Sequence, residues 1–145
     1  MKNGSKRGFS VILTFFLLIG GGLAWAAKAP IAPENRVKEA DTVLQGEVVQ
    51  VTSQVKKSTV ERAPGRHRDT EYSLRVKVTQ VDKGAGVRVG ETVVVTAWKP
   101  HTRLPRYPGL QGHESISEKG DSATFYLLKS GAGYEPLLPN VIDIK

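Results

Sequence analysis

Two basic segments of the chain carry the residue types that suit anion binding. Residues 56–69 include Arg66 and Arg68, and residues 99–107 combine three cations with a tyrosine. Guanidinium and ammonium groups neutralise phosphate, sulfate or uronate groups, and an aromatic ring beside them stacks on a base or a sugar. The residues predicted to bind ligand are therefore Arg66, Arg68, Trp98, Lys99, Arg103, Arg106 and Tyr107.

Positive charge is concentrated in these two segments rather than spread along the chain. Each segment carries a net charge of +3, while the other residues after position 26 together carry −2. If the two segments meet in space, they form one basic patch. The alternative is that both are ordinary loops, in which solvated charge is common.

The three histidines and the serines near them do not form a pattern that predicts catalysis or metal binding. His67, His101 and His113 have neither the His-x-His nor the His-Glu-x-x-His spacing, and zinc or copper sites need three or four ligands in tight geometry. Ser115 and Ser117 lie close to His113 but lack the glycine-flanked turn of a nucleophile. The sequence therefore predicts a non-enzymatic protein with no catalytic residue, no metal and no cofactor.

The first 26 residues have the order of a secretory signal peptide. Residues 1–7 contain three basic groups and no acid, residues 9–19 are almost wholly apolar, and Ala24 and Ala26 are small. This order predicts cleavage after Ala26 and export to the periplasm or the cell exterior. The alternative is a retained N-terminal anchor, the one way in which this sequence would contact a membrane, although the apolar run is short of the ~20 residues of a span.

Removing 26 of the 145 residues leaves 119, the length of one ordinary domain. The chain has no cysteine, which excludes both disulfides and a lipid-anchored lipoprotein. Without the three basic residues of the predicted signal peptide, 18 basic residues remain against 14 acidic ones, a net charge of +4. This modest excess does not predict a specific nucleic-acid partner.

After a predicted flexible leader at residues 27–40, residues 41–145 have the pattern of an all-β domain. Within the leader, residues 34–40 suit either one helical turn or irregular chain. The clearest strand is residues 72–78, where apolar and polar residues alternate. Gly46 lies inside the first strand pattern, which indicates a bulge or bend. The predicted strands are residues 43–55, 72–78, 92–98, 121–129 and 134–144. The last of these is either one strand or two short pieces, because Pro136 and Pro139 interrupt it.

Residues 99–119 form a long connection between the third and fourth predicted strands. This segment is rich in proline and glycine, and a connection of its length in a compact domain is usually functional or disordered. An alternative is that it closes one end of the fold with Leu104, Tyr107, Leu110 and Ile116. Five strands with this interruption predict a small antiparallel barrel.

The order of these elements resembles the OB-fold, a five-stranded barrel with a long bent first strand. More narrowly, residues 40–48, residues 78–84 and residues 120–128 resemble netrin-like modules, the group that includes the tissue inhibitors of metalloproteinases. The resemblance implies an OB-like barrel and a secreted setting. It does not imply protease inhibition, because the animal inhibitors depend on disulfides and an N-terminal cysteine. As a whole the chain is similar to exported bacterial proteins with such a barrel, a group that brings no function with it.

We therefore expect an exported binding domain for an anionic ligand, such as an acidic polysaccharide, recognised by the two basic segments. The alternative is a protein–protein interaction module of the cell envelope or extracellular space. Such a module would dock an envelope protein on a strand edge and on the proline-rich connection.

Overall fold

The computed structural model describes residues 31–106, 111–138 and 142–144, the last of these by backbone only. The predicted signal peptide, residues 1–26, lies outside the described residues. Within the described part of the chain, no helix is long and apolar enough to cross a membrane. The elements are α1 (Pro33–Glu39), β1 (Thr42–Lys57), β2 (Arg66–Lys83), β3 (Thr92–Leu104), β4 (Ser122–Ser130), β5 (Gly133–Pro136) and β6 (Ile142–Ile144).

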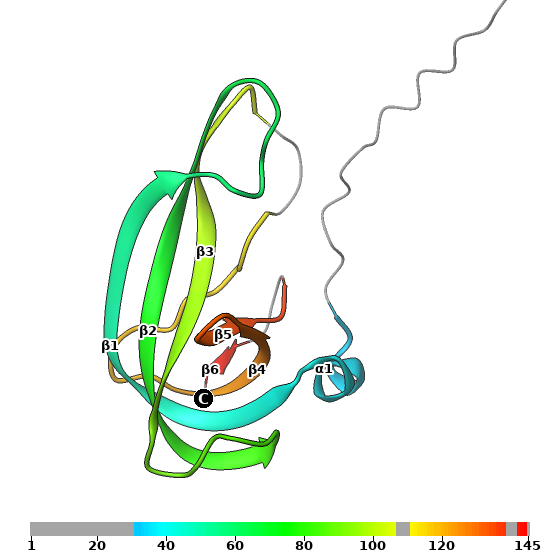
Figure 1. Cartoon of the computed structure of the whole chain (residues 1–145), viewed down its shortest axis with the longest axis vertical. Helices are drawn as coiled ribbons and strands as arrows, with labels where there is room; N and C mark the ends of the chain where they lie inside the picture. The colour runs from blue at the N-terminus through cyan, green and yellow to red at the C-terminus, as the bar shows by residue number, and fades with distance from the viewer. Residues whose placement is uncertain (1–30, 107–110, 139–141, 145) are drawn as a thin grey trace, which may run out of the picture.

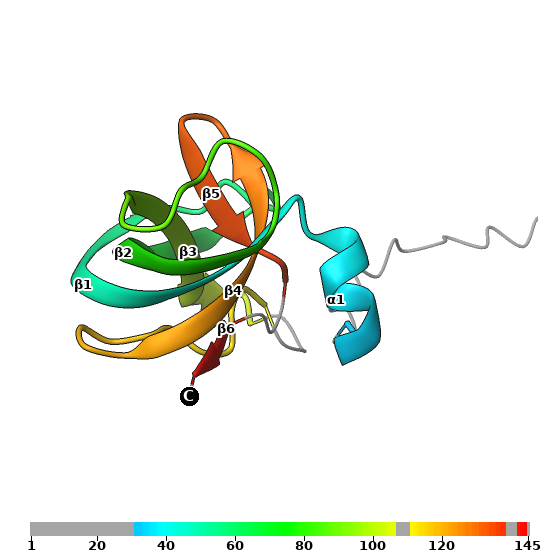
Figure 2. The ribbon, with the colours of Figure 1, turned by 90° about the horizontal axis from the view of Figure 1, so that it is seen from below.

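Five strands join edge to edge into a closed ring, which we call the ring (Figures 1 and 2). Its order is β1, β2, β3, β5, β4 and back to β1. The short β6 pairs with residues 123–125 of β4, on the edge that β5 occupies further along that strand. The predicted all-β architecture is therefore confirmed. The sheet is mixed, however, because β3 and β5 pair in parallel at Val95 and Tyr134. A wholly antiparallel ring was the wrong expectation, since an odd number of strands cannot alternate direction all the way around a closed ring.

The first strand closes the ring because it pairs on both of its edges. Its residues 42–47 pair with β4, and the whole strand pairs with β2. At Gly46 a side-chain Cβ would lie 2.8 Å from the carbonyl oxygen of Lys77, so only glycine fits between the strands. The register against β2 shifts between Gln45 and Gly46, which confirms the bend predicted there.

The interior of the ring is filled by apolar side chains from all its long strands. On β2 the predicted alternation is confirmed, because Leu74, Val76 and Val78 are buried while Arg75 and Lys77 between them are exposed. The other buried members of this core are Leu44, Val48, Val87, Val95, Ala97, Ala123, Phe125 and Leu127. Ile116, from the long connection, packs against this core, whereas Leu104 is exposed, so only part of the predicted closure is present.

A short helix, α1, lies beside the ring near β1 and β4 (Figure 2), and its flanking residues Ile31 and Ala40 pack against Val43 and Leu137. It settles the alternatives for residues 34–40 in favour of helix, with Pro33 in the first turn, where its missing N–H is not needed. The Arg36 guanidinium lies 6.0 Å from the centre of the Tyr126 ring. At the C-terminal end, the Lys83 ammonium donates to the carbonyl oxygens of Val37 and Ala40, at 2.8 and 2.6 Å.

Beyond the ring, β1, β2 and β3 continue together as a three-stranded extension, which we call the arm (Figure 1). It comprises residues 50–57, 66–73 and 96–104. Six of the eight basic residues in the two segments, all but Arg62 and Arg106, therefore lie on strands and not in loops, which corrects the sequence-based expectation. Pro100 does not end β3, because the register shifts at this point and the strand forms a bulge opposite Arg68 and Asp69.

Candidate functional site

The strand register of the arm sorts its side chains onto two faces. In an antiparallel pair, residues directly opposite each other share a face, and successive residues on a strand alternate between faces. Thr70 is opposite Lys99, and Arg68 is opposite Thr102, which places these residues on one face. Glu71 is opposite both Gln54 and Trp98, and Asp69 is opposite both Lys56 and Pro100, which places these residues on the other face.

Three of the predicted ligand-binding residues meet on the first of these faces. Arg66 and Arg68 lie two positions apart on β2 and are exposed, and Lys99 on neighbouring β3 is half-buried. We call Arg66, Arg68 and Lys99 the basic face. The arm positions that share this face by register carry no carboxylate among the described residues. The two basic segments are therefore neighbours in space, with part of their charge on one surface.

Arg103 lies on the opposite face and is buried, which corrects its predicted role. Its guanidinium forms an ion pair with Asp69, and these two side chains are only 8 and 10% exposed. It also donates to the carbonyl oxygens of Arg68 and Thr102, at 2.7 and 3.0 Å, and to the amide oxygen of Gln111 at 2.8 Å. The donors of Arg103 are thus engaged inside the molecule, where they join β2, β3 and the connection after β3.

Trp98 also faces away from the basic face, so it cannot stack on a ligand bound there. Its backbone is held by the long connection, because His113 N–H donates to the Trp98 carbonyl at 2.9 Å. The indole meets the His113 imidazole edge to face, with ring centres 6.3 Å apart. Gly112 passes so close that a Cβ there would lie 2.6 Å from the Trp98 carbonyl oxygen, and its φ of +75° also favours glycine.

His113 is a structural residue that its place in the sequence does not reveal. Its side chain accepts a hydrogen bond from Trp98 N–H at Nδ1, at 3.1 Å, and its Nε2 lies 3.1 Å from the carbonyl oxygen of Pro136. The ring proton therefore resides on Nε2 and is donated to Pro136. Burial lowers the pKa of His113 below its ordinary value, although its backbone hydrogen bonds act in the opposite direction. A neutral imidazole thus bonds to β3 at Trp98, where no strand of the described part of the chain pairs with that edge.

A groove of about 300 Å³ lies on the same side of the arm as Trp98. We call it the Trp98 groove. Its lining comes from the end of β1 and the loop after it, from β2 and β3, and from the segment that includes and follows β5. Within the lining, Lys56 Nζ and Glu71 Oε1 form an ion pair at 2.6 Å. The residues that line the groove and matter below are Lys57, Asp69, Glu71, Thr96, Trp98 and Glu135.

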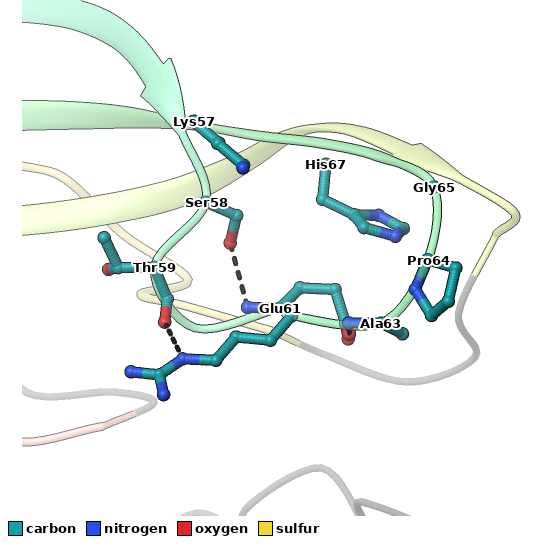
Figure 3. Close-up of a pocket in the computed structure, with 9 residues that line it drawn as sticks. Lys57, Ser58, Thr59, Glu61, Ala63, Pro64, Gly65 and His67 are labelled. Atoms are coloured by element: carbon teal, nitrogen blue, oxygen red, sulfur yellow. Dashed lines mark hydrogen bonds between the residues drawn. The ribbon is translucent and has the colours of Figure 1, made fainter.

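A second cavity, of about 520 Å³, lies within the loop that joins β1 to β2 (Figure 3). The loop is held by its own hydrogen bonds. Ser58 Oγ accepts from Glu61 N–H at 3.0 Å, and the Glu61 carboxylate accepts from Ala63 N–H at 2.9 Å. Figure 3 shows the His67 ring facing into the opening that the loop encloses. The Ser58 hydroxyl thus helps to fix the fold of the loop.

Two predicted site residues remain, Arg106 and Tyr107. Arg106 is exposed just beyond β3, and Tyr107 lies outside the described residues. His101 is exposed, with its Nδ1 2.9 Å from the hydroxyl of Thr102. Within the described ranges, no group of three or more histidine, cysteine, aspartate or glutamate side chains is placed to hold a metal ion.

Comparisons with models of protein families, with curated proteins and with solved structures give no match to this chain. A functional assignment therefore has to come from the arm, where the predicted site residues divide between two faces of different chemistry.

Proposed function

We propose that this chain is an exported, non-enzymatic binding domain that takes an anionic ligand, such as an acidic polysaccharide, on the basic face. The observation that carries the proposal is the placement of Arg66, Arg68 and Lys99 side by side on paired strands. Side chains two residues apart on a strand are separated by about 7 Å. A row of cations at this spacing can contact successive charged groups of an extended polyanion, and no carboxylate of the arm competes on that face.

The strand order also supports the proposal that the ring is an OB-like barrel, as the resemblance to netrin-like modules implies. An OB-fold is a five-stranded, partly open barrel that binds oligonucleotides or oligosaccharides over strands 2 and 3 and the loops beside them. In this chain β2 and β3 are the strands that extend into the arm, and the loop between β1 and β2 lies at its tip. The basic face therefore lies on the strands that such a barrel uses for ligands.

Retention of the full chain on immobilised heparin across a salt gradient tests the anion site. The variant Arg66→Ala/Arg68→Ala should elute at clearly lower salt than the unchanged protein, because counterion release scales with the number of neutralised charges. The matched control is Arg75→Ala/Lys77→Ala, which removes two exposed cations from the ring portion of the same strand. If both double variants shift equally, retention reflects net charge alone and the basic face is not a site.

A second candidate function, docking of an envelope protein, is favoured by the outer edge of β1. This strand pairs with β4 only up to Glu47, and Val48 bonds to the backbone of Gly120 and Asp121. No strand covers the outer edge at residues 50–57 among the described residues. A partner strand could pair there through backbone hydrogen bonds. Binding of that kind would persist at high salt, whereas binding to the basic face would be lost.

A further inference from the structure

We propose that the Trp98 groove is a separate binding site for an uncharged six-membered sugar ring. The proposal does not depend on the anion site, because Trp98, Glu71 and Asp69 lie on the opposite face of the arm from Arg66, Arg68 and Lys99. It rests on three features of the groove, which are a fixed aromatic ring, carboxylate oxygens with remaining acceptor capacity, and nearly balanced charge.

The fixed aromatic ring is Trp98. Its backbone N–H and carbonyl are both bound to His113, and Gly112 approaches two carbons of its six-membered ring, so the indole is held from the side of the long connection. Trp98 remains partly exposed and lines the groove. Because the Trp98 side chain is already held in place, stacking of a ligand on it causes little further loss of side-chain entropy. The C–H face of a pyranose is a suitable apolar surface for such a ring.

Asp69 and Glu71 line the groove together with this ring, and each has one carboxylate oxygen without a hydrogen bond among the described contacts. Each ionised carboxylate offers about four acceptor positions. Glu71 receives hydrogen bonds from Lys56 and Gln54 at Oε1, and Asp69 is bound by Arg103 at Oδ1. The second oxygens, Oε2 and Oδ2, are left as acceptors for hydroxyl groups. Because their first oxygens are held by cations, both carboxylates stand in set positions before a ligand arrives.

Hydrogen-bond donors line the same groove, so it can both donate to and accept from a sugar hydroxyl. Lys57, the last residue of β1, and Thr96 are among its lining residues, and Glu135 adds an exposed acceptor. A sugar hydroxyl donates one hydrogen bond and accepts others, which requires such a mixture. The groove volume of about 300 Å³ is at the lower limit of small-molecule sites, which suits one ring and not a large ligand.

The Trp98 groove differs from the basic face in its net charge. Asp69 is neutralised by Arg103 and Glu71 by Lys56, while Lys57 and Glu135 carry opposite charges. A strongly anionic or cationic ligand therefore gains little from the groove, and an uncharged sugar loses nothing there. We expect a saccharide bound at Trp98 to be selected by shape and hydroxyl pattern and to bind almost independently of salt.

Tryptophan fluorescence tests this proposal directly. The chain has two tryptophans, Trp25 and Trp98, so in the variant Trp25→Phe the indole of the groove is the sole emitter. Titration of this full-chain variant with cellohexaose, maltohexaose and chitohexaose should give a saturable change in emission with at least one of them. Glu71→Gln, which keeps the shape but weakens the acceptor, should weaken that binding about ten-fold. Glu47→Gln, the same exchange at an exposed position in the ring, should leave it unchanged.

Removal of the anion site on the basic face should not affect sugar binding in the Trp98 groove. Arg66→Ala/Arg68→Ala should lose heparin retention and keep the fluorescence response to the neutral sugar. As a second measurement, amide and indole signals of Thr96, Trp98 and Leu138 should shift together in a nuclear magnetic resonance titration. The proposal is wrong if none of the three neutral hexasaccharides produces a saturable change. It is equally wrong if tetramethylammonium produces the same response, which would assign the groove to cations.

Discussion

The ring and the arm share three strands, but different side chains hold them together. In the ring, Leu74 and Phe125 are fully buried among other apolar residues. In the arm, the Arg103 side chain is bound to Asp69 and to backbone carbonyl oxygens. Apolar burial is non-directional and tolerates small shifts, whereas an ion pair needs its partner at one position. We infer that the ring carries the stability of the fold and that the arm is a polar structure mounted on it.

The largest expected effect comes from breaking the ring at Phe125. This side chain is fully buried at the centre of the core, and its truncation leaves a cavity that its neighbours cannot fill. Phe125→Ala should lower the free energy of unfolding by about 3–5 kcal/mol, measured by urea denaturation. Val94→Ala, at an exposed position on β3, is the control and should change it by less than about 0.5 kcal/mol. Similar effects of the two changes would contradict an apolar core as the source of stability.

The next largest effect tests whether the arm unfolds apart from the ring. Arg103→Met leaves the mostly buried Asp69 carboxylate without its cation, at a cost of about 3 kcal/mol. Amide hydrogen exchange should become faster in residues 66–73 and 96–104, while protection in β4 persists. The double variant Arg103→Met/Asp69→Leu should recover most of the loss, since no charge is then stranded. Equal destabilisation of the single and double variants would show that the arm does not depend on this pair.

Acidification should lower the stability of the protein through His113, which bonds to Trp98 of β3 and lies beside Pro136. Because burial lowers the pKa of folded His113 below 6.5, the unfolded chain binds more protons than the folded one between these two values. Stability should therefore be full above pH 6.5, fall as the pH decreases below it, and level off below the folded pKa. Urea midpoints from pH 8 to pH 5 measure this. His113→Gln should flatten the decrease, and His101→Gln, at an exposed position, should leave it in place.

The smallest effect is expected at the exposed pair of the arm. Lys56 and Glu71 bond at 2.6 Å, but their side chains are 46 and 35% exposed, so solvent screens the attraction. Lys56→Met should cost less than about 1 kcal/mol, and the difference from the unchanged protein should shrink in 1 M NaCl. A loss as large as that of Arg103→Met would mean that exposed and buried pairs contribute alike, and the distinction between them would fail.

The same contrast explains how much of the molecule could be predicted from its sequence. The ring follows from local pattern, because the alternation at residues 72–78 and the glycine at position 46 each imply one backbone geometry. The arm does not, because residues 66–71 lack apolar alternation and form a strand only through pairing with residues distant in the chain. The sequence predicts that Arg103 binds the anionic group of a ligand, whereas the anion bound in the structure is the carboxylate of Asp69, 34 positions away in the chain. No spacing rule joins His113 to Trp98 across the long connection.

The double pairing of β1 also constrains the order of events while the chain is being made. Val43 pairs with Lys83 of β2 and with Tyr126 of β4. The pairing of β1 is therefore complete only after β4, a strand late in the sequence, has been synthesised. A nascent chain that stops before Ser122 can form the three-stranded sheet but leaves Leu44 and Val48 without the cover of Phe125. Growing chains of this protein must therefore pass through a stage with an open apolar surface, during which a holding partner or rapid completion of synthesis protects against aggregation.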